Sequence, residues 1–329
     1  MNKILSICIP SYNMEEFLSR CLDSMIIDEV LPQLEIIIVN DGSKDRTLEI
    51  ANGYKERYPE SVVVIDKPNG HYGSCINASL KVATGKYFRI VDADDWVDSQ
   101  ALVTFVHKLE ELDVDCVCTK YAERSEKEVD EKTFAATFNT VLDLNQYELP
   151  VECFRMHCLT YSTALLRNIG YVQTEGICYT DTEYTYIPLS CSRNIYFMDI
   201  VLYQYLVDRE GQSMSLKERL KNDMHIYQVM ERINQVHHEN LPFNNNEPRI
   251  WSYSESYIIE WCAMVYIFFL DYDETKEKKL RPMIAELRKE NALWFTGMWS
   301  SKRMAVFYLW YFSGRLSKYL MIPFRRFKM

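Results

Sequence analysis

Three carboxylates stand within four residues in the stretch GKYFRIVDADDWVDS, residues 85–99, directly after an apolar run typical of a buried strand. Asp92, Asp94 and Asp95 repel one another when ionised, and a cation between them relieves that repulsion. Magnesium and manganese prefer carboxylate oxygens and leave coordination positions for phosphate. The cluster therefore predicts a Mg2+ or Mn2+ site that holds a diphosphate. The alternative is that these acids only line a solvated turn or cap the helix expected near Ser99.

The residues before this cluster alternate between apolar runs and amphipathic segments. The apolar runs predict four strands, at 4–10, 34–40, 61–66 and 86–91. Apolar residues at helical spacing predict three helices between them, at 14–25, 44–58 and 73–84. Strict alternation with short connections predicts right-handed crossovers and a mostly parallel sheet of the α/β, nucleotide-binding type. Asn13 and Glu16 predict a capping box for the first helix.

Three polar motifs follow three of these strands. PSYN (10–13) follows the first strand, NDGSKDRT (40–47) the second and DADDW (92–96) the fourth. Ligands of open parallel sheets bind beyond the carboxyl ends of the strands, so we expect the motifs to converge on one edge. Farther along we expect a helix at 101–112, a strand at 113–121, a solvated loop at 122–132, and helices from 216 onward.

Charge is distributed unevenly along the chain. The net charge is −10, but the last 29 residues hold seven Lys and Arg and no acid, which leaves −17 for the first 300. An acidic body argues against nucleic acid as a partner, whereas basic residues interleaved with aromatic ones suit an anionic membrane surface. The absence of a signal-peptide pattern and ten cysteines without a CxxC pair predict a cytoplasmic chain with reduced thiols.

Four segments together resemble the family 2 glycosyltransferases, which have the GT-A fold: SICIPSYNMEEFLSRCLDSM, IIIVNDGSKDRT, NGHYGSCINASLKVATGKYFRIVDADDW and REGQSMS. The similarity runs from about Leu5 to Ser215. It implies an inverting transferase that uses a nucleotide-diphosphate sugar and a divalent cation. We accordingly expect a catalytic domain at 1–215, divided into a nucleotide-sugar half (about 1–98) and an acceptor half (about 99–215). A helical region at 216–329 would follow, with a membrane-associating tail at about 301–329.

The resemblance assigns roles to the motif residues. Pro10 and Tyr12 would border the nucleotide pocket, and Asp41 matches the acid that accepts a hydrogen bond from the base, commonly uracil. Asp92 and Asp94 match the DxD motif, with Asp94 the direct metal ligand and Asp92 on the ribose or a metal-bound water. Asp95 would assist the metal or cap the next helix, and the sequence leaves open which of the three acids touches the metal.

The helix before the DxD strand departs from the family pattern. Many members carry an Arg-Asn pair there, and this chain has Ile76 and Asn77. Asn77 is retained as a candidate nucleotide-sugar ligand. The arginine's part would fall to another cation, for which the candidates are Lys67, His71, Arg89 and Arg209.

The base that deprotonates the acceptor hydroxyl is expected in GICYTDTEYTYIPL, residues 176–189. Asp181 matches the family base, Thr180 replaces the preceding Glu, and Glu183 is the reserve candidate. The alternative is that both acids only begin a helix. The REGQSMS loop resembles a segment that closes over the donor, with Arg209, Gln212 and Ser213 as phosphate donors.

These expectations predict an enzyme that transfers one sugar from a UDP-sugar to a lipid-linked or growing cell-surface polysaccharide. It would act at the inner face of the cell membrane, held there by its tail. Two alternatives remain: a catalytically inactive membrane adaptor with the same fold, or a sugar-nucleotide pyrophosphorylase, which should show a glycine-rich loop after the first strand.

Overall fold

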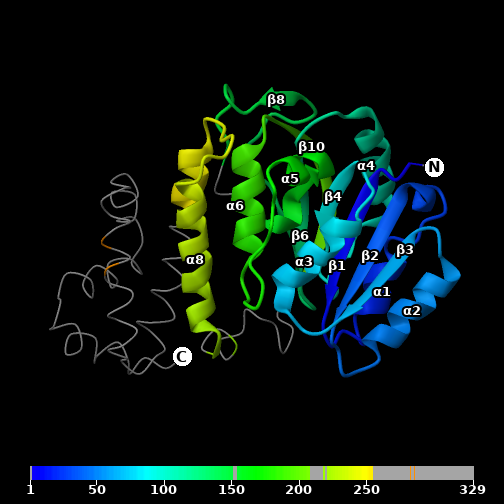
Figure 1. Ribbon diagram of the computed structural model, residues 1–329. Helices are drawn as coiled ribbons and strands as arrows, with labels where there is room; N and C mark the ends of the chain where they lie inside the picture. Colours follow the sequence, from blue (N-terminus) through cyan, green and yellow to red (C-terminus); the bar gives the residue numbers. More distant parts are fainter. Residues whose placement is uncertain are drawn as a thin grey trace.

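The computed structural model describes residues 2–150, 154–207, 218, 221–254, 282 and 285. Its first half alternates strands and helices as expected (Figure 1). The elements are β1 (Leu5–Ser11), α1 (Leu18–Asp23), a short 3-10 helix (Leu31–Gln33), β2 (Leu34–Asp41), α2 (Thr47–Arg57), β3 (Val62–Lys67), α3 (His71–Val82) and β4 (Tyr87–Ile90). All pairings among β3, β2, β1 and β4 are parallel. The predicted α/β class is therefore confirmed.

The second half continues the same sheet. It consists of β5 (Trp96–Val97), α4 (Ser99–Glu111), β6 (Cys116–Arg124), β7 (Val129–Lys132), β8 (Val141–Asp143), a 3-10 helix (Met156–Cys158), β9 (Leu159–Ser162), α5 (Thr163–Asn168), α6 (Asp181–Cys191) and β10 (Asn194–Leu206). The strand order is β3-β2-β1-β4-β9-β6-β10-β5, with β7 on β6 and β8 on β10. Because β9 runs antiparallel to β4 and β6, it joins two parallel regions into one mixed sheet.

Two local predictions were wrong. Helix α1 begins at Leu18 rather than near Met14, because Asn13 has a positive φ of 54° and its side chain accepts a hydrogen bond from Lys44 N at 2.8 Å. The capping box therefore does not form. Residues 122–132 are exposed as expected over 126–131, but they are not a loop: they contain the antiparallel β6–β7 hairpin.

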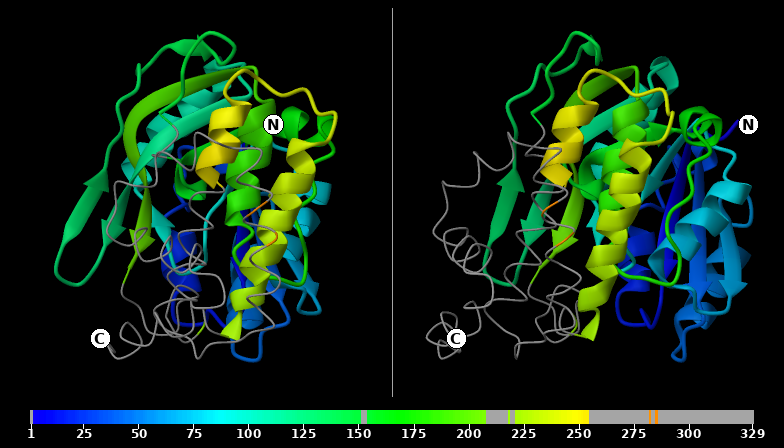
Figure 2. Two further views of the ribbon diagram at one scale, coloured as in Figure 1. Left: turned by 90° about the vertical axis from the view of Figure 1, so that its left-hand side faces the viewer. Right: turned by 60° about the vertical axis from the view of Figure 1, so that its left-hand side comes forward.

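The described part of the C-terminal region packs on the sheet domain. Helix α8 (Asp223–His237) lies along α6 (Figure 2). Val229, Met230, Ile233 and Val236 on α8 belong to the same buried core as the sheet. The domain boundary near residue 215 stays a prediction, and the tail at 301–329 lies outside the described residues. Among the described helices, none combines the length and apolarity needed to cross a membrane.

Candidate functional site

The three polar motifs meet at one cavity of about 690 Å³ at the carboxyl ends of β1, β2 and β4. Its lining is contributed by strand ends and the residues after them, by the region before and at the start of α3, by one residue before α6, and by the region before and at the start of α8. The lining residues are Pro10, Ser11, Tyr12, Met14, Asp41, Asn69, His71, Tyr72, Cys75, Asp92, Ala93, Asp94, Cys178, Tyr205, Glu218, Lys221, Asn222 and His225. A cavity of this size can hold a nucleotide-sized ligand. The parallel registers of β1, β2 and β4 cause the convergence, because they bring the strand ends to a common edge.

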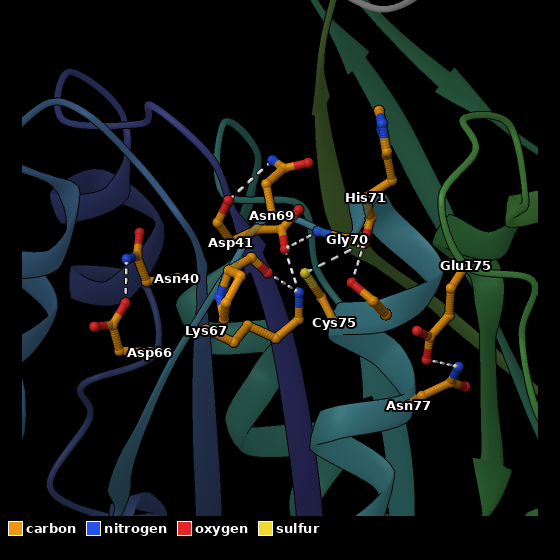
Figure 3. Close-up of polar contacts among 12 residues, drawn as sticks. Asn40, Asp41, Asp66, Lys67, Asn69, Gly70, His71, Cys75, Asn77 and Glu175 are labelled. Carbon is orange, nitrogen blue, oxygen red and sulfur yellow. Dashed lines mark hydrogen bonds and ion pairs between the residues drawn. The ribbon is translucent and has the colours of Figure 1, made fainter.

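Asp41 is held rigidly at one side of this cavity (Figure 3). Its Oδ1 accepts a hydrogen bond from Gly70 N at 2.9 Å and pairs with the Lys67 ammonium, while Asn69 Nδ2 donates to its backbone carbonyl at 2.9 Å. The side chain is nearly buried, and a buried carboxylate needs a charged partner, which Lys67 provides. Lys67 is consequently committed to Asp41.

Asp92 lies at the acidic centre of the cavity. Its Oδ1 accepts a hydrogen bond from Tyr72 Oη at 2.8 Å. Burial raises the pKa of Asp92 to about 7, and the nearby charges of Asp94 and Asp181 add to that rise, whereas the Tyr72 hydrogen bond opposes it. Asp94 lines the same cavity, and its backbone carbonyl accepts from Arg20 at 2.6 Å. Two neighbouring carboxylates, Asp92 and Asp94, in one cavity fit a site that takes a cation.

Asp95 is bound to β10 next to this centre. Its Oδ2 accepts from Tyr203 Oη at 2.6 Å and its Oδ1 from Leu206 N at 2.8 Å. It is buried and does not line the cavity. Both carboxylate oxygens of Asp95 thus accept hydrogen bonds from β10, and its expected part in metal binding stays a prediction.

His157 is a neighbour of the acidic centre that the sequence reasoning missed. One ligand atom from each of Asp92, Asp95 and His157 lies within 4.8 Å of the others, and the ring stacks on Tyr205 with centroids 4.5 Å apart. Burial, aided by the charges of Arg155 and Arg89, lowers the pKa of His157 to about 3, which keeps the ring neutral. Nothing in the sequence marks it, because a lone His between Met156 and Cys158 has no ligand spacing.

Asp181 and Glu183 begin α6, but they diverge from there. Two residues along a helix turn the side-chain direction by about 200°, so the two acids cannot share a face. Asp181 does not line the cavity, but its charge helps to raise the pKa values of Asp92, Tyr72 and Tyr205, which do, and burial raises its own pKa. Glu183 is fully buried, and its Oε2 accepts from Thr174 N at 2.9 Å.

Two other candidates lie away from the cavity. Asn77 Nδ2 donates to Glu175 Oε1 at 2.8 Å (Figure 3). It also donates to Gln173 O at 2.9 Å, and Gln173 in turn donates to Thr180 O at 2.9 Å. Asn77 therefore holds the segment that leads to Asp181 and does not line the cavity.

Arg89 is likewise no phosphate ligand. It is fully buried within the sheet and donates to Thr160 Oγ1 at 2.8 Å and to the His157 carbonyl. The candidates Arg209, Gln212 and Ser213 lie outside the described residues.

Comparisons with known proteins agree with this geometry. A family model described as glycosyl transferase family 2 matches residues 6–170. A poly(ribitol-phosphate) beta-glucosyltransferase of Bacillus spizizenii is 32% identical over 216 residues, which cover 64% of this chain and 33% of that protein. The glycosyltransferase EpsJ of Bacillus subtilis is 38% identical over 128 residues, or 39% of this chain and 37% of that protein. The matches thus span about a third of the length of these curated relatives.

Solved structures support the fold. Staphylococcus aureus TarS 1-349, in complex with UDP-GlcNAc, superposes with a TM-score of 0.64 at 17% identity, covering 98% of this chain and 89% of that one. Mannosyltransferase PcManGT from Pyrobaculum calidifontis, in complex with GDP-Man and Mn2+, has a TM-score of 0.54 at 14% identity, covering 98% of this chain and 86% of that one. These likenesses confirm the expected GT-A fold. With the family model matching half of its residues, the chain belongs to glycosyl transferase family 2.

Proposed function

We propose that this chain is an inverting, metal-dependent glycosyltransferase that moves one sugar from a UDP-sugar to a hydroxyl of a lipid-linked or growing cell-surface polysaccharide. The observation that carries the proposal is the gathering of Asp41, Asp92 and Asp94 around one cavity, with Asp181 beside it. Further support comes from the relatives, which include a glucosyltransferase named for poly(ribitol-phosphate) and a TarS complex with UDP-GlcNAc.

In the proposed donor site, Asp41 accepts a hydrogen bond from the base. A carboxylate suits the N3–H donor of uracil, and the Lys67 and Gly70 contacts hold it in one orientation. Pro10 and Tyr12 border the same end of the cavity. Asp94 and Asp92 would hold a Mg2+ or Mn2+ that neutralises charge on the departing diphosphate.

Asp181 is the proposed general base. Inverting transfer is a single displacement, so one carboxylate suffices to take the proton from the attacking hydroxyl. The pKa of Asp181 is raised by burial, and a base works best when its pKa approaches the operating pH. Asn77 and Gln173 act on Asp181 only through the backbone that they position.

Calorimetric titration of UDP, with GDP beside it, tests the donor site. We expect UDP to bind in a Mn2+-dependent manner, with Asp94→Asn abolishing that dependence. Asp181→Asn should bind UDP as the wild type does and lose transfer, because it removes the base but no metal ligand. The exposed Asp28→Asn is the control for loss of one negative charge.

Equal loss of UDP binding in Asp94→Asn and Asp181→Asn would contradict this division of roles. Failure of the wild type to bind either nucleotide would favour the inactive adaptor. The tail at 301–329 is proposed to hold the enzyme on the anionic inner face of the membrane.

A further inference from the structure

The cavity has a second wall that the family match does not include. Besides the strand ends, it is lined by Cys178 and by Glu218, Lys221, Asn222 and His225 before and at the start of α8. These residues follow the stretch 6–170 that the family model matches. The C-terminal region therefore completes the pocket, although it carries no motif of its own.

His225 is held in a defined position on that wall. Its Nδ1 accepts a hydrogen bond from Cys178 N at 3.2 Å, and its ring meets the ring of His71 edge-on at 6.0 Å. It also stands four residues before Val229 and eight before Ile233, both fully buried, so it continues the core-facing side of α8. Packing of α8 thus fixes where the imidazole lies.

The bond from Cys178 also fixes the chemistry of that imidazole. Because Nδ1 accepts, the proton of the neutral ring resides on Nε2, which becomes a hydrogen-bond donor. His71 adds a second imidazole, and Figure 3 shows its side chain projecting beyond the start of α3, away from the Asp41–Lys67 contacts. These imidazoles therefore line the same cavity as Asp92 and Asp94.

Asn222 and Lys221 extend the donor set. Asn222 occupies the N-cap of α8, where Asn usually accepts a bond from the first turn. Within the described residues its side chain makes no capping bond and instead lines the cavity. Lys221 pairs with Glu218 at 3.5 Å, but its side chain is 72% exposed, and exposed pairs contribute little. The ammonium can exchange that partner for an anion.

We propose that His225, Asn222 and Lys221 bind the diphosphate oxygens of the donor, so that α8 clamps the nucleotide against the strand ends. The inference rests on the proposed function for the identity of the ligand. In the proposed donor site, Asp41 with its Lys67 partner binds the base and the Asp92–Asp94 pair holds the cation. The remaining donors that line the cavity, at the start of α8, are then left for the diphosphate. The N-terminal end of a helix adds a partial positive charge in the same direction.

Titrations with UDP, uridine and inorganic pyrophosphate in Mg2+ buffer test the clamp. Asn222→Asp retains a good N-cap but places a negative charge against the diphosphate, and His225→Ala removes the Nε2 donor. Each variant should bind UDP and pyrophosphate about tenfold more weakly, the usual effect of one lost bond to a charged group, and bind uridine unchanged. His238→Ala, at the other end of α8 about 20 Å away, is the matched control and should behave as the wild type.

The outcomes separate this inference from the proposed function. Wild-type UDP affinity in both variants, or an equal loss for uridine and UDP, would overturn the clamp and leave the transferase proposal intact. If the wild type binds pyrophosphate but not UDP, and the variants lose the pyrophosphate binding, the anion site is upheld and the UDP-sugar donor is rejected. Binding of neither ligand by the wild type would overturn both.

Discussion

The buried carboxyl of Glu183 makes the stability of this protein depend on pH. Its Oε2 accepts from Thr174 N, whereas its Oε1 is buried without a partner among the described residues. Burial raises the pKa of Glu183 from 4.5 to about 7, against the opposing effects of the Thr174 hydrogen bonds and the charge of Arg232. The folded state therefore prefers the protonated acid more strongly than the unfolded state does.

The sign and size of the effect follow from that difference. Below the unfolded pKa the acid is protonated in both states and has no effect. As the pH rises from about 4.5 to about 7, ionisation favours the unfolded chain, and above the folded pKa the cost levels off at about 3 kcal/mol. Between pH 5 and pH 8 Glu183 should thus lower the free energy of unfolding by about 2.5 kcal/mol.

Glu183→Gln removes this titration while keeping the shape of the side chain. Urea unfolding of the variant and the wild type at both pH values gives the difference in free energy of unfolding. We expect that difference to move in favour of the variant by about 2.5 kcal/mol between pH 5 and pH 8. Any penalty for burying the new amide is the same at both pH values and cancels.

Glu56→Gln, on the exposed face of α2, controls for exchange of a glutamate on a helix. A Glu183→Gln difference that stays constant with pH would refute the reasoning, because it would mean that the buried carboxyl ionises in the fold without penalty.

Three further predictions concern packing, positioning and the tail. Gly73→Ala should destabilise the protein by roughly 2 kcal/mol or more, because the added Cβ would stand 2.0 Å from Thr174 O. Gly53→Ala is the control: its Cβ would have no atom within 4 Å, and the change should stabilise the helix by about 0.5 kcal/mol. Similar unfolding midpoints for the two variants would contradict this prediction. Asn77→Ala should lower the free energy of unfolding by about 1–3 kcal/mol, because it removes the hydrogen bond to Gln173 O, and should leave UDP affinity unchanged in titration. Loss of UDP binding without loss of stability would instead mean that Asn77 binds the nucleotide. Truncation before Ser301 should release the protein from anionic vesicles in a flotation assay, and undiminished binding would count against an anchor.

Much of the fold could be read from the sequence because local patterns specify it. The run LEIIIVN is apolar throughout, and in the structure β2 is buried along its whole length. Parallel strands share an edge, so the order of the elements alone brings Pro10, Asp41 and Asp92 to one cavity. Local details of the chain were predicted less well. Asn13 could cap a helix or lie in a turn, and its hydrogen bond from Lys44 N stabilises the turn.

The roles of individual side chains depended on contacts that no sequence pattern contains. Asp94 and Asp95 are adjacent and chemically identical, yet Asp94 lines the cavity, whereas Asp95 does not line it and accepts hydrogen bonds from the distant Tyr203 and Leu206. Arg89 resembles a surface cation in the sequence and is buried in the sheet. His225 has no motif and reaches the pocket only because α8 packs on α6. The sequence by itself determined the α/β architecture and the edge where the site forms, since periodicity and strand order are local properties. Only the tertiary structure decided which acids and donors line the cavity, because a side chain's direction is set by partners many residues away.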